Sequence, residues 1–336
     1  MSRRKFSVIL PVRNGMPHII DAVNSVLNQT FENFELHILD NKSTDGTLEW
    51  CKSIDDARVI VSVSKDPLSI EDSWGRIVNI DKSEFITMFA HDDILFPEFL
   101  ENIDSLIRKY PDAKLYQTNG ELIDYKGSLI RECQPINEVE TSNDYLKARF
   151  SNNRDVFGTG YVMRAEAYDS LGGIPKFNKL SFADDALWLM LIGDGYKACC
   201  KLKSFQVRIH ENSTSATNPN NWFGFLLAMK QFAEFLEKFQ LFRPSSNIDL
   251  IKLKKSFFKQ YMSNIYILGQ VHHADQGIDF SEEDLKLFID TYRLLSGSSF
   301  GSLIFTPKVF PIFVLSKIYP SLLPSLWRVY QSFRSN

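Results

Sequence analysis

The sequence predicts an α/β fold, with a mostly parallel sheet flanked by helices and an α-helical region at the C-terminal end. Short apolar runs alternate with helical patterns over the first hundred residues. That alternation is typical of a parallel sheet whose two faces are covered by helices. After residue 217 the strand pattern stops, and aromatic-rich segments of helical spacing follow. We therefore expect two domains, residues 1–217 and residues 218–336.

Four apolar runs predict the first strands of the sheet, at residues 6–12, 34–40, 58–64 and 84–90. Helices are expected between them, starting near Pro17 and Thr47 and over residues 70–82. Another helix is expected from about Pro97. Parallel sheets bind their ligands at the carboxyl ends of the strands. The residues that directly follow the first, second and fourth runs should therefore share one edge: 11–14, 40–45 and 91–93.

The pattern loosens after Lys114. Residues 114–132 predict a β-hairpin that turns at Lys126–Gly127, and a helix is expected near 142–150. Another short helix is expected over "ADDALWLMLIGDGY", and a strand ends in "FQVRIH".

Composition narrows the class of protein. The formal net charge is -3, and no basic face stands out over the first 300 residues, so nucleic acid is not an expected partner. The four cysteines have no metal-site spacing, which indicates reduced thiols. The basic start is followed by an apolar run only as long as a strand, unlike a signal peptide. We expect a cytoplasmic protein.

The last 35 residues differ from the rest. Residues 302–336 contain four basic residues and no acidic one, and four prolines interrupt their apolar stretches. No uninterrupted run reaches the ~18–20 residues that a spanning helix needs. One interpretation is a tail packed on the helical domain; the other is a segment lying on the anionic inner face of a membrane. The helical region is also a candidate for acceptor binding or homo-oligomer contacts.

Asp92 and Asp93 follow the fourth predicted strand directly. One interpretation is helix capping, because acidic residues near a helix start complement its dipole and Pro97 suits a first turn. The other is a cation site. Two adjacent carboxylates repel each other unless a cation or a shared proton relieves the repulsion, and a hard divalent ion prefers oxygen ligands.

Other polar residues follow strands or begin helices. Asp40 ends the second strand, where its carboxylate could accept hydrogen bonds from a ribose or a base, while residues 43–45 suit a capping turn. "ADD" at 183–185 is a second acidic pair at a helix start, and His210 follows the last strand. The chain has no GxxxxGK[ST] and no GxSxG, and no GxGxxG follows the first strand.

Four blocks in this order resemble the family 2 glycosyltransferases: "SVILPVRNGMPHIIDAVNSVLNQTFENFELHILDNKSTDGTLEW", "HDD", "ADDALWLM" and "RIHENSTS". The resemblance covers roughly residues 5–215. It implies the GT-A fold, a Rossmann-like sheet that binds a nucleotide-sugar, and transfer of the sugar with inversion. It also implies a UDP-sugar as donor, Mn²⁺ or Mg²⁺ as cofactor, and a saccharide or lipid-linked saccharide as acceptor in cell-surface polysaccharide synthesis.

The resemblance also implies site residues. Asp93 would be the direct metal ligand, with His210 helping to hold the metal or the pyrophosphate. Counting back from Leu187 and Trp188 makes Asp184 the catalytic base, with Asp185 as its rival, because alanine stands where the family has the glutamate of an E-D pair. Gly75 stands where relatives often have asparagine. The residues expected around the donor are Pro11, Val12, Arg13, Asn14, Asp40, Asn41, Arg76 and Asp92.

The chemistry gives these residue types their roles. An acceptor hydroxyl is a weak nucleophile near neutral pH, so a carboxylate must remove its proton, a step worth about 10²–10⁴-fold. A divalent cation offsets the charge on the leaving diphosphate. Three alternatives stay open. The missing glutamate would suit a nucleotide-sugar-binding module without catalysis. A dinucleotide oxidoreductase would need a glycine fingerprint, and a nucleotidyltransferase would need a basic glycine-rich loop, and this sequence has neither.

Overall fold

The computed structural model describes residues 4–210, 219–239, 248–277 and 280–334, which belong to two compact units. The first unit comprises Met1–Lys176 and Phe182–Ser213, and the second comprises Phe177–Ser181 and Thr214–Asn336. The predicted boundary between residues 217 and 218 lies outside the described residues and stays a prediction. The short segment 177–181, which the sequence analysis assigns to the first domain, groups with the second unit.

The first unit is built on a sheet whose strand order is β3-β2-β1-β4-β9-β6-β10-β5, with β7 paired to β6 and β8 to β10. The strands in chain order are β1 Phe6–Val12, β2 Phe34–Asp40, β3 Val59–Val63, β4 Phe85–Met88, β5 Ile94–Leu95, β6 Leu115–Ile123, β7 Leu129–Glu132, β8 Val139–Glu140, β9 Tyr161–Arg164 and β10 Lys197–Arg208. The predicted α/β class is confirmed, and the sheet is mixed, with four parallel and five antiparallel strand pairs among the described residues.

The pairing of these strands follows the sequence pattern in its first half. Strands β3, β2, β1 and β4 are all parallel, and β6 is parallel to β10. Strand β9 joins the two parallel groups by running antiparallel to both β4 and β6. The hairpin predicted at Lys126–Gly127 is present, because β6 and β7 pair antiparallel on either side of it.

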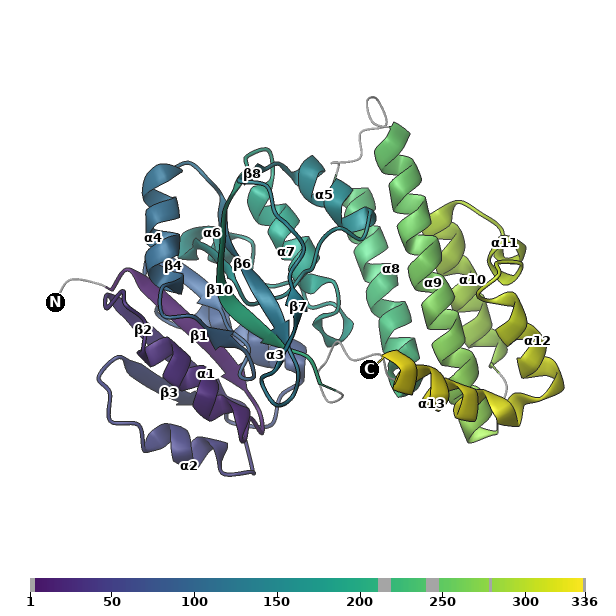
Figure 1. Cartoon of the computed structure of the whole chain (residues 1–336), viewed down its shortest axis with the longest axis horizontal. Coiled ribbons are helices and arrows are strands. Elements are labelled where there is room, and N and C mark those ends of the chain that lie inside the picture. The colour runs from purple at the N-terminus through teal and green to yellow at the C-terminus, as the bar shows by residue number, and fades with distance from the viewer. Residues whose placement is uncertain (1–3, 211–218, 240–247, 278–279, 335–336) are drawn as a thin grey trace. The chain divides into compact units, whose positions relative to one another are not determined.

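Helices flank this sheet (Figure 1). They are α1 His18–Leu27, α2 Thr47–Lys52, α3 Ile70–Gly75 with the 3-10 turn η1 Arg76–Asn79, α4 Phe99–Lys109, α5 Ser142–Phe150, α6 Ala165–Ser170 and α7 Ala183–Ile192. The apolar stripe of α1, formed by Ile19, Ala22, Val23 and Val26, is buried in one core with the side chains of β1 and β2. This packing fixes the sheet edge where the polar residues lie.

The second unit is helical, as predicted. Its elements are η2 Asn178–Leu180, η3 Pro219–Asn221, α8 Trp222–Lys238, α9 Ile248–Gln276, α10 Glu282–Ser296, α11 Phe300–Ile304, α12 Phe310–Ile318, η4 Pro320–Leu322 and α13 Leu323–Arg334. The long helix α9 packs against α8, α10, α12 and α13. Trp222 is buried with its ring 5.0 Å from that of Phe280. Over the described ranges, none of the helices combines the length and the apolar character needed to cross a bilayer.

Candidate active site

The carboxyl ends of the first three strands are level with one another. Val12 pairs with Asp40 in the parallel register, and Asp40 pairs with Val63. Beyond the last pair, the Asn41 amide donates to the Val12 carbonyl at 2.8 Å. Arg76 fastens the same edge: its Nη1 donates to the Asp40 carbonyl at 2.9 Å and its Nη2 to the Ser62 carbonyl at 3.0 Å.

The loop after β1 is bonded to the loop after β2. The Asn14 amide donates to Ser43 Oγ at 2.9 Å, and the Asn14 side-chain oxygen accepts the Thr44 amide at 2.8 Å. Gly15 has no room for a side chain, because a Cβ there would lie 2.7 Å from Val12 Cγ2. Pro11 and Val12 are buried and Arg13 is exposed. The sequence prediction that 11–14 and 40–45 share an edge is therefore confirmed.

Asp40 and Asn41 have different surroundings although they are neighbours. The Asn41 side chain is fully engaged with the backbone of Leu68, donating to its carbonyl at 3.0 Å and accepting its amide at 2.8 Å. Asp40 is buried; its Oδ1 accepts the Ser43 amide at 3.2 Å, and its Oδ2 has no hydrogen-bond partner among the described residues. A buried carboxylate oxygen needs a donor, so Asp40 is suited to receive one from a ligand.

Asp93 is held entirely by the protein. Its Oδ1 accepts the Arg208 amide at 3.0 Å, and its Oδ2 accepts the Thr159 hydroxyl at 2.6 Å. Burial and the charge of Asp92 raise the pKa of Asp93 to about 8. Both oxygens therefore have structural partners, and the carboxylate ties the turn after β4 to β10 and to Thr159, two residues before β9.

Asp92 has a more open position. It is half-buried, and its Oδ2 lies 2.8 Å from Nε2 of His210. The ring of His18 lies 6.1 Å from the ring of His210 and 4.7 Å from that of Tyr125. Burial, then the charge of Arg208, lowers the pKa of His18. The Asp92 carboxylate therefore lies beside the imidazole of His210, with the rings of His18 and Tyr125 close to that imidazole.

Arg208 holds the turn that contains Asp92 and Asp93. Its Nε donates to the Asp92 carbonyl at 2.9 Å, and its Nη1 donates to the Tyr125 carbonyl at 2.9 Å. The side chain is 4% exposed. Its backbone amide also holds Asp93, so one residue positions the acidic pair against the loop between β6 and β7. Arg208 is not among the site residues predicted from the sequence, although its place two residues before His210 was a usable signal.

The second acidic pair is divided by its surroundings. Asp185 is buried; its Oδ1 accepts the Tyr145 hydroxyl at 2.7 Å, and Arg149 Nε lies 3.0 Å from each of its oxygens. Asp184 is half-buried and accepts the amide of Asp185 at 2.8 Å. Burial and the charge of Asp185 raise the pKa of Asp184 to about 7. Asp185 is thus bound to α5, and Asp184 is the carboxylate that can exchange a proton near neutral pH.

The fit of a divalent cation depends on these donors. Over the described ranges, no three His, Cys, Asp or Glu side chains gather in a way that could hold a metal ion. Asp92 and His210 offer one carboxylate and one imidazole, which suit Mn²⁺ when a diphosphate and water supply the other ligands. Asp93 accepts a hydrogen bond on each of its oxygens, whereas Asp92 Oδ2 is paired with Nε2 of His210.

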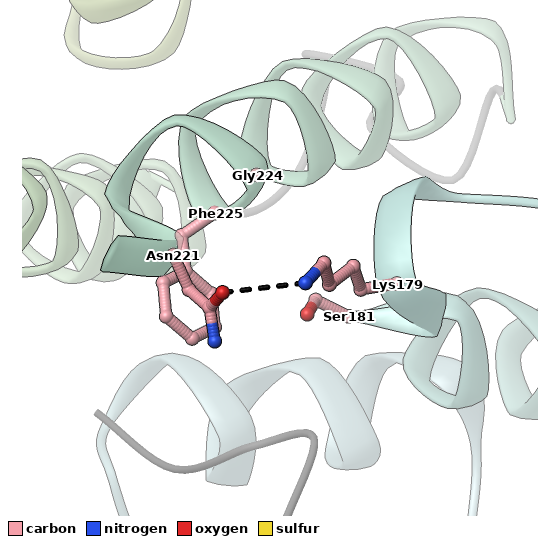
Figure 2. A pocket seen from close by; sticks show the side chains of 5 residues that line it. All are labelled: Lys179, Ser181, Asn221, Gly224 and Phe225. Carbon is pink, nitrogen blue, oxygen red and sulfur yellow. Dashed lines mark hydrogen bonds between the residues drawn. The ribbon is translucent and has the colours of Figure 1, made fainter. Parts of the chain in front are cut away.

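A separate small pocket lies in the second unit (Figure 2). Its lining residues are Lys179, Ser181, Asn221, Gly224 and Phe225, and Lys179 Nζ donates to Asn221 Oδ1 at 3.2 Å. None of the site residues predicted from the sequence lines it. It has no carboxylate in its lining and adds nothing to the acidic site of the first unit.

Comparison with known proteins identifies the fold and the family. The model of glycosyl transferase family 2 matches residues 7–172. The chain belongs to this family. The structure of S. aureus TarS 1–349, solved in complex with UDP-GlcNAc, aligns with a TM-score of 0.55 and 17% identity, covering 88% of this chain and 91% of that one. The predicted GT-A fold is confirmed.

Curated relatives match a smaller share of this chain than the TarS structure does. EpsE of Bacillus subtilis is 25% identical over 213 residues, which are 62% of this chain and 74% of EpsE. An uncharacterized glycosyltransferase of Rickettsia felis is 28% identical over 130 residues, 38% of this chain. The match spans only 22% of that Rickettsia protein.

Proposed function

We propose that this family 2 protein is an inverting, metal-dependent glycosyltransferase that moves a sugar from a UDP-sugar to a hydroxyl of a saccharide or lipid-linked saccharide, as in cell-surface polysaccharide synthesis. The observation that carries the proposal is the contrast between the two members of the second acidic pair. Asp185 is ion-paired with Arg149, whereas Asp184 is half-buried with a pKa raised to about 7 by burial and the charge of Asp185.

Asp184 is the proposed general base. A carboxylate with an ordinary pKa is too weak a base to take the proton of a hydroxyl efficiently, and a pKa near the working pH is the most effective. In the proposed step the acceptor oxygen attacks the anomeric carbon, its proton passes to Asp184, and the bond to the UDP oxygen breaks. The configuration at the anomeric carbon is inverted, because the attacking oxygen and the leaving group lie on opposite faces of the sugar. UDP leaves with the bonding electrons.

The donor is proposed to bind at the edge formed by β1, β2 and β3. The unpartnered Oδ2 of Asp40 would accept a hydrogen bond from the uracil or the ribose. Arg76 shapes the pocket through the Asp40 and Ser62 carbonyls, and Asn41 braces Leu68. The solved TarS complex with UDP-GlcNAc supports a UDP-sugar, since it has the same fold.

The cation is proposed to sit with Asp92 and His210. The expectation that Asp93 is the direct ligand stays a prediction; Asp93 accepts hydrogen bonds from Thr159 and Arg208, whereas Asp92 faces an imidazole. When bound, Mn²⁺ or Mg²⁺ offsets the negative charge that develops on the leaving diphosphate. The imidazole makes Mn²⁺ more competitive than in a site made of oxygens alone.

A donor panel tests the proposal. Purified full-length protein is incubated with UDP-sugars and Mn²⁺, with and without lipid-linked saccharide acceptors, and release of UDP is measured. We expect release with at least one UDP-sugar and its loss by about 10²–10⁴-fold in Asp184→Asn. Asp194→Asn is the matched control, because Asp194 is an exposed carboxylate just beyond the other end of α7. UDP binding with no turnover for any donor would favour the non-catalytic binding module instead.

A further inference from the structure

The residues around α12 expose more large apolar side chains than any comparable stretch of the described chain. Eighteen large hydrophobic side chains are exposed in the described residues, and six of them lie between residues 305 and 326. They are Phe305, Phe310, Ile318, Tyr319, Leu322 and Leu326. Phe305 is 75% exposed, and its ring stacks on that of Phe310 at 5.8 Å. Exposed apolar side chains gathered in one segment favour an interaction site.

Helix α12 is apolar on two sides. Its inner side packs into the second unit, where Ile312 and Leu315 lie against a cluster formed by Ile267, Val271 and Leu323. Its outer side carries exposed Phe310 and Ile318, eight residues and thus about two turns apart, together with Lys317. A helix with apolar residues on both sides usually has both sides covered. The outer side of α12 is left exposed by the described residues.

The charge of this region indicates what the partner is. Lys308, Lys317 and Arg328 are exposed, and no acidic residue occurs from Ser302 to the end of the chain. A second copy of the same segment would add further basic residues and no acidic one. An anionic lipid surface supplies both negative charge and an apolar layer for the aromatic side chains.

We propose that the 305–328 surface, defined by the six exposed apolar residues together with Lys308, Lys317 and Arg328, docks the protein on a bilayer that contains anionic lipids. Leu, Ile and Phe side chains enter the acyl boundary, and the lysine and arginine side chains contact lipid phosphates. Docking of this kind is interfacial and reversible, and it requires no spanning helix. The proposal does not depend on the transferase activity, so it can fail or stand separately from it.

Vesicle flotation of the full chain tests it. Vesicles of phosphatidylcholine alone are compared with vesicles of phosphatidylcholine and phosphatidylglycerol. We expect binding to the anionic vesicles and weaker binding as salt rises, because salt screens the lipid charge. Lys317→Gln with Arg328→Gln should reduce binding by about fivefold for each residue. Ile318→Ser with Leu322→Ser should reduce it by about tenfold for each residue.

Leu294→Ser is the matched control. Leu294 is an exposed leucine of α10 in the same unit, outside the proposed surface, so its loss should leave vesicle binding unchanged. Equal binding of the wild type and of a variant that combines all four of these substitutions would overturn the proposal. So would an absence of binding to anionic vesicles at low salt. A dimer in size-exclusion chromatography that dissociates on the same substitutions would assign the surface to a second copy and would also overturn it.

Discussion

Arg149 forms an ion pair with Asp185 in which its Nε lies 3.0 Å from both carboxylate oxygens. The pair joins α5 to the first turn of α7, and Tyr145 adds a hydrogen bond from the same helix. Asp184, one residue earlier, points its carboxylate to a different environment. This relationship separates an ion-paired carboxylate from the proposed base, which the sequence "ADD" does not do.

The first prediction concerns stability. Asp185→Asn should lower the free energy of unfolding by about 3–5 kcal/mol, because it leaves the Arg149 guanidinium partly buried without its counter-charge. Asp184→Asn should change stability little or raise it at pH 8, since it removes a buried charge. Urea unfolding followed by circular dichroism measures both. If the two variants lost equal stability, the ion pair would not be the feature that distinguishes them.

The second prediction concerns the pH dependence of transfer. The base acts when deprotonated, so kcat/KM should rise as the pH passes about 7, where burial and Asp185 place the pKa of Asp184. The charged and titratable groups around it are Asp185, Arg149, Tyr145 and Tyr161. Asp185→Asn removes the negative neighbour and should move the acidic limb to lower pH. A limb that stays in place in that variant would contradict the assignment.

The same pKa has a consequence for folding. Because the pKa of Asp184 is higher in the folded chain than its usual 3.8, its contribution to stability is complete below pH 4 and is lost as the pH rises to about 7. The stability difference between wild type and Asp184→Asn should therefore shift in favour of the variant between pH 5 and pH 8. Denaturant titrations at both pH values measure it.

The third prediction separates the two acids after β4. Asp92→Asn should weaken Mn²⁺-dependent binding of UDP and leave the melting temperature nearly unchanged. Asp93→Asn should lower the free energy of unfolding by about 1–3 kcal/mol, since an amide can no longer accept from both Arg208 and Thr159. Isothermal titration calorimetry and thermal melts on the two variants give the comparison. Metal-dependent binding lost only in Asp93→Asn would restore Asp93 as the ligand.

The fourth prediction concerns Gly160, which precedes β9. Its φ is +91°, and a Cβ there would lie 2.3 Å from the ring of Phe205. Gly160→Ala should therefore destabilise the first unit by about 1–3 kcal/mol, the cost typical of overpacking a core, with further cost from the left-handed backbone. Gly172→Ala is a matched control for the backbone alone, because Gly172 has φ +76° and no atom within 4 Å of a Cβ.

Local pattern alone specified much of this protein. Apolar runs placed β1 and β2 at their observed residues, because a strand that is buried on both faces needs apolar side chains along most of its length. The alternation with helices fixed the α/β class and the shared edge of Asn14 and Asp40. The four ordered motifs carried the resemblance to the family, which the match over residues 7–172 supports.

Only the tertiary structure decided the surroundings of each member of the two acidic pairs. "HDD" and "ADD" each present two carboxylates that are equivalent in sequence, and their partners lie far along the chain: His210 for Asp92, Arg208 and Thr159 for Asp93, and Arg149 for Asp185. The proton affinity of a carboxylate is set by burial and by the charges around it. Those surroundings exist only after strands and helices distant in sequence have packed together.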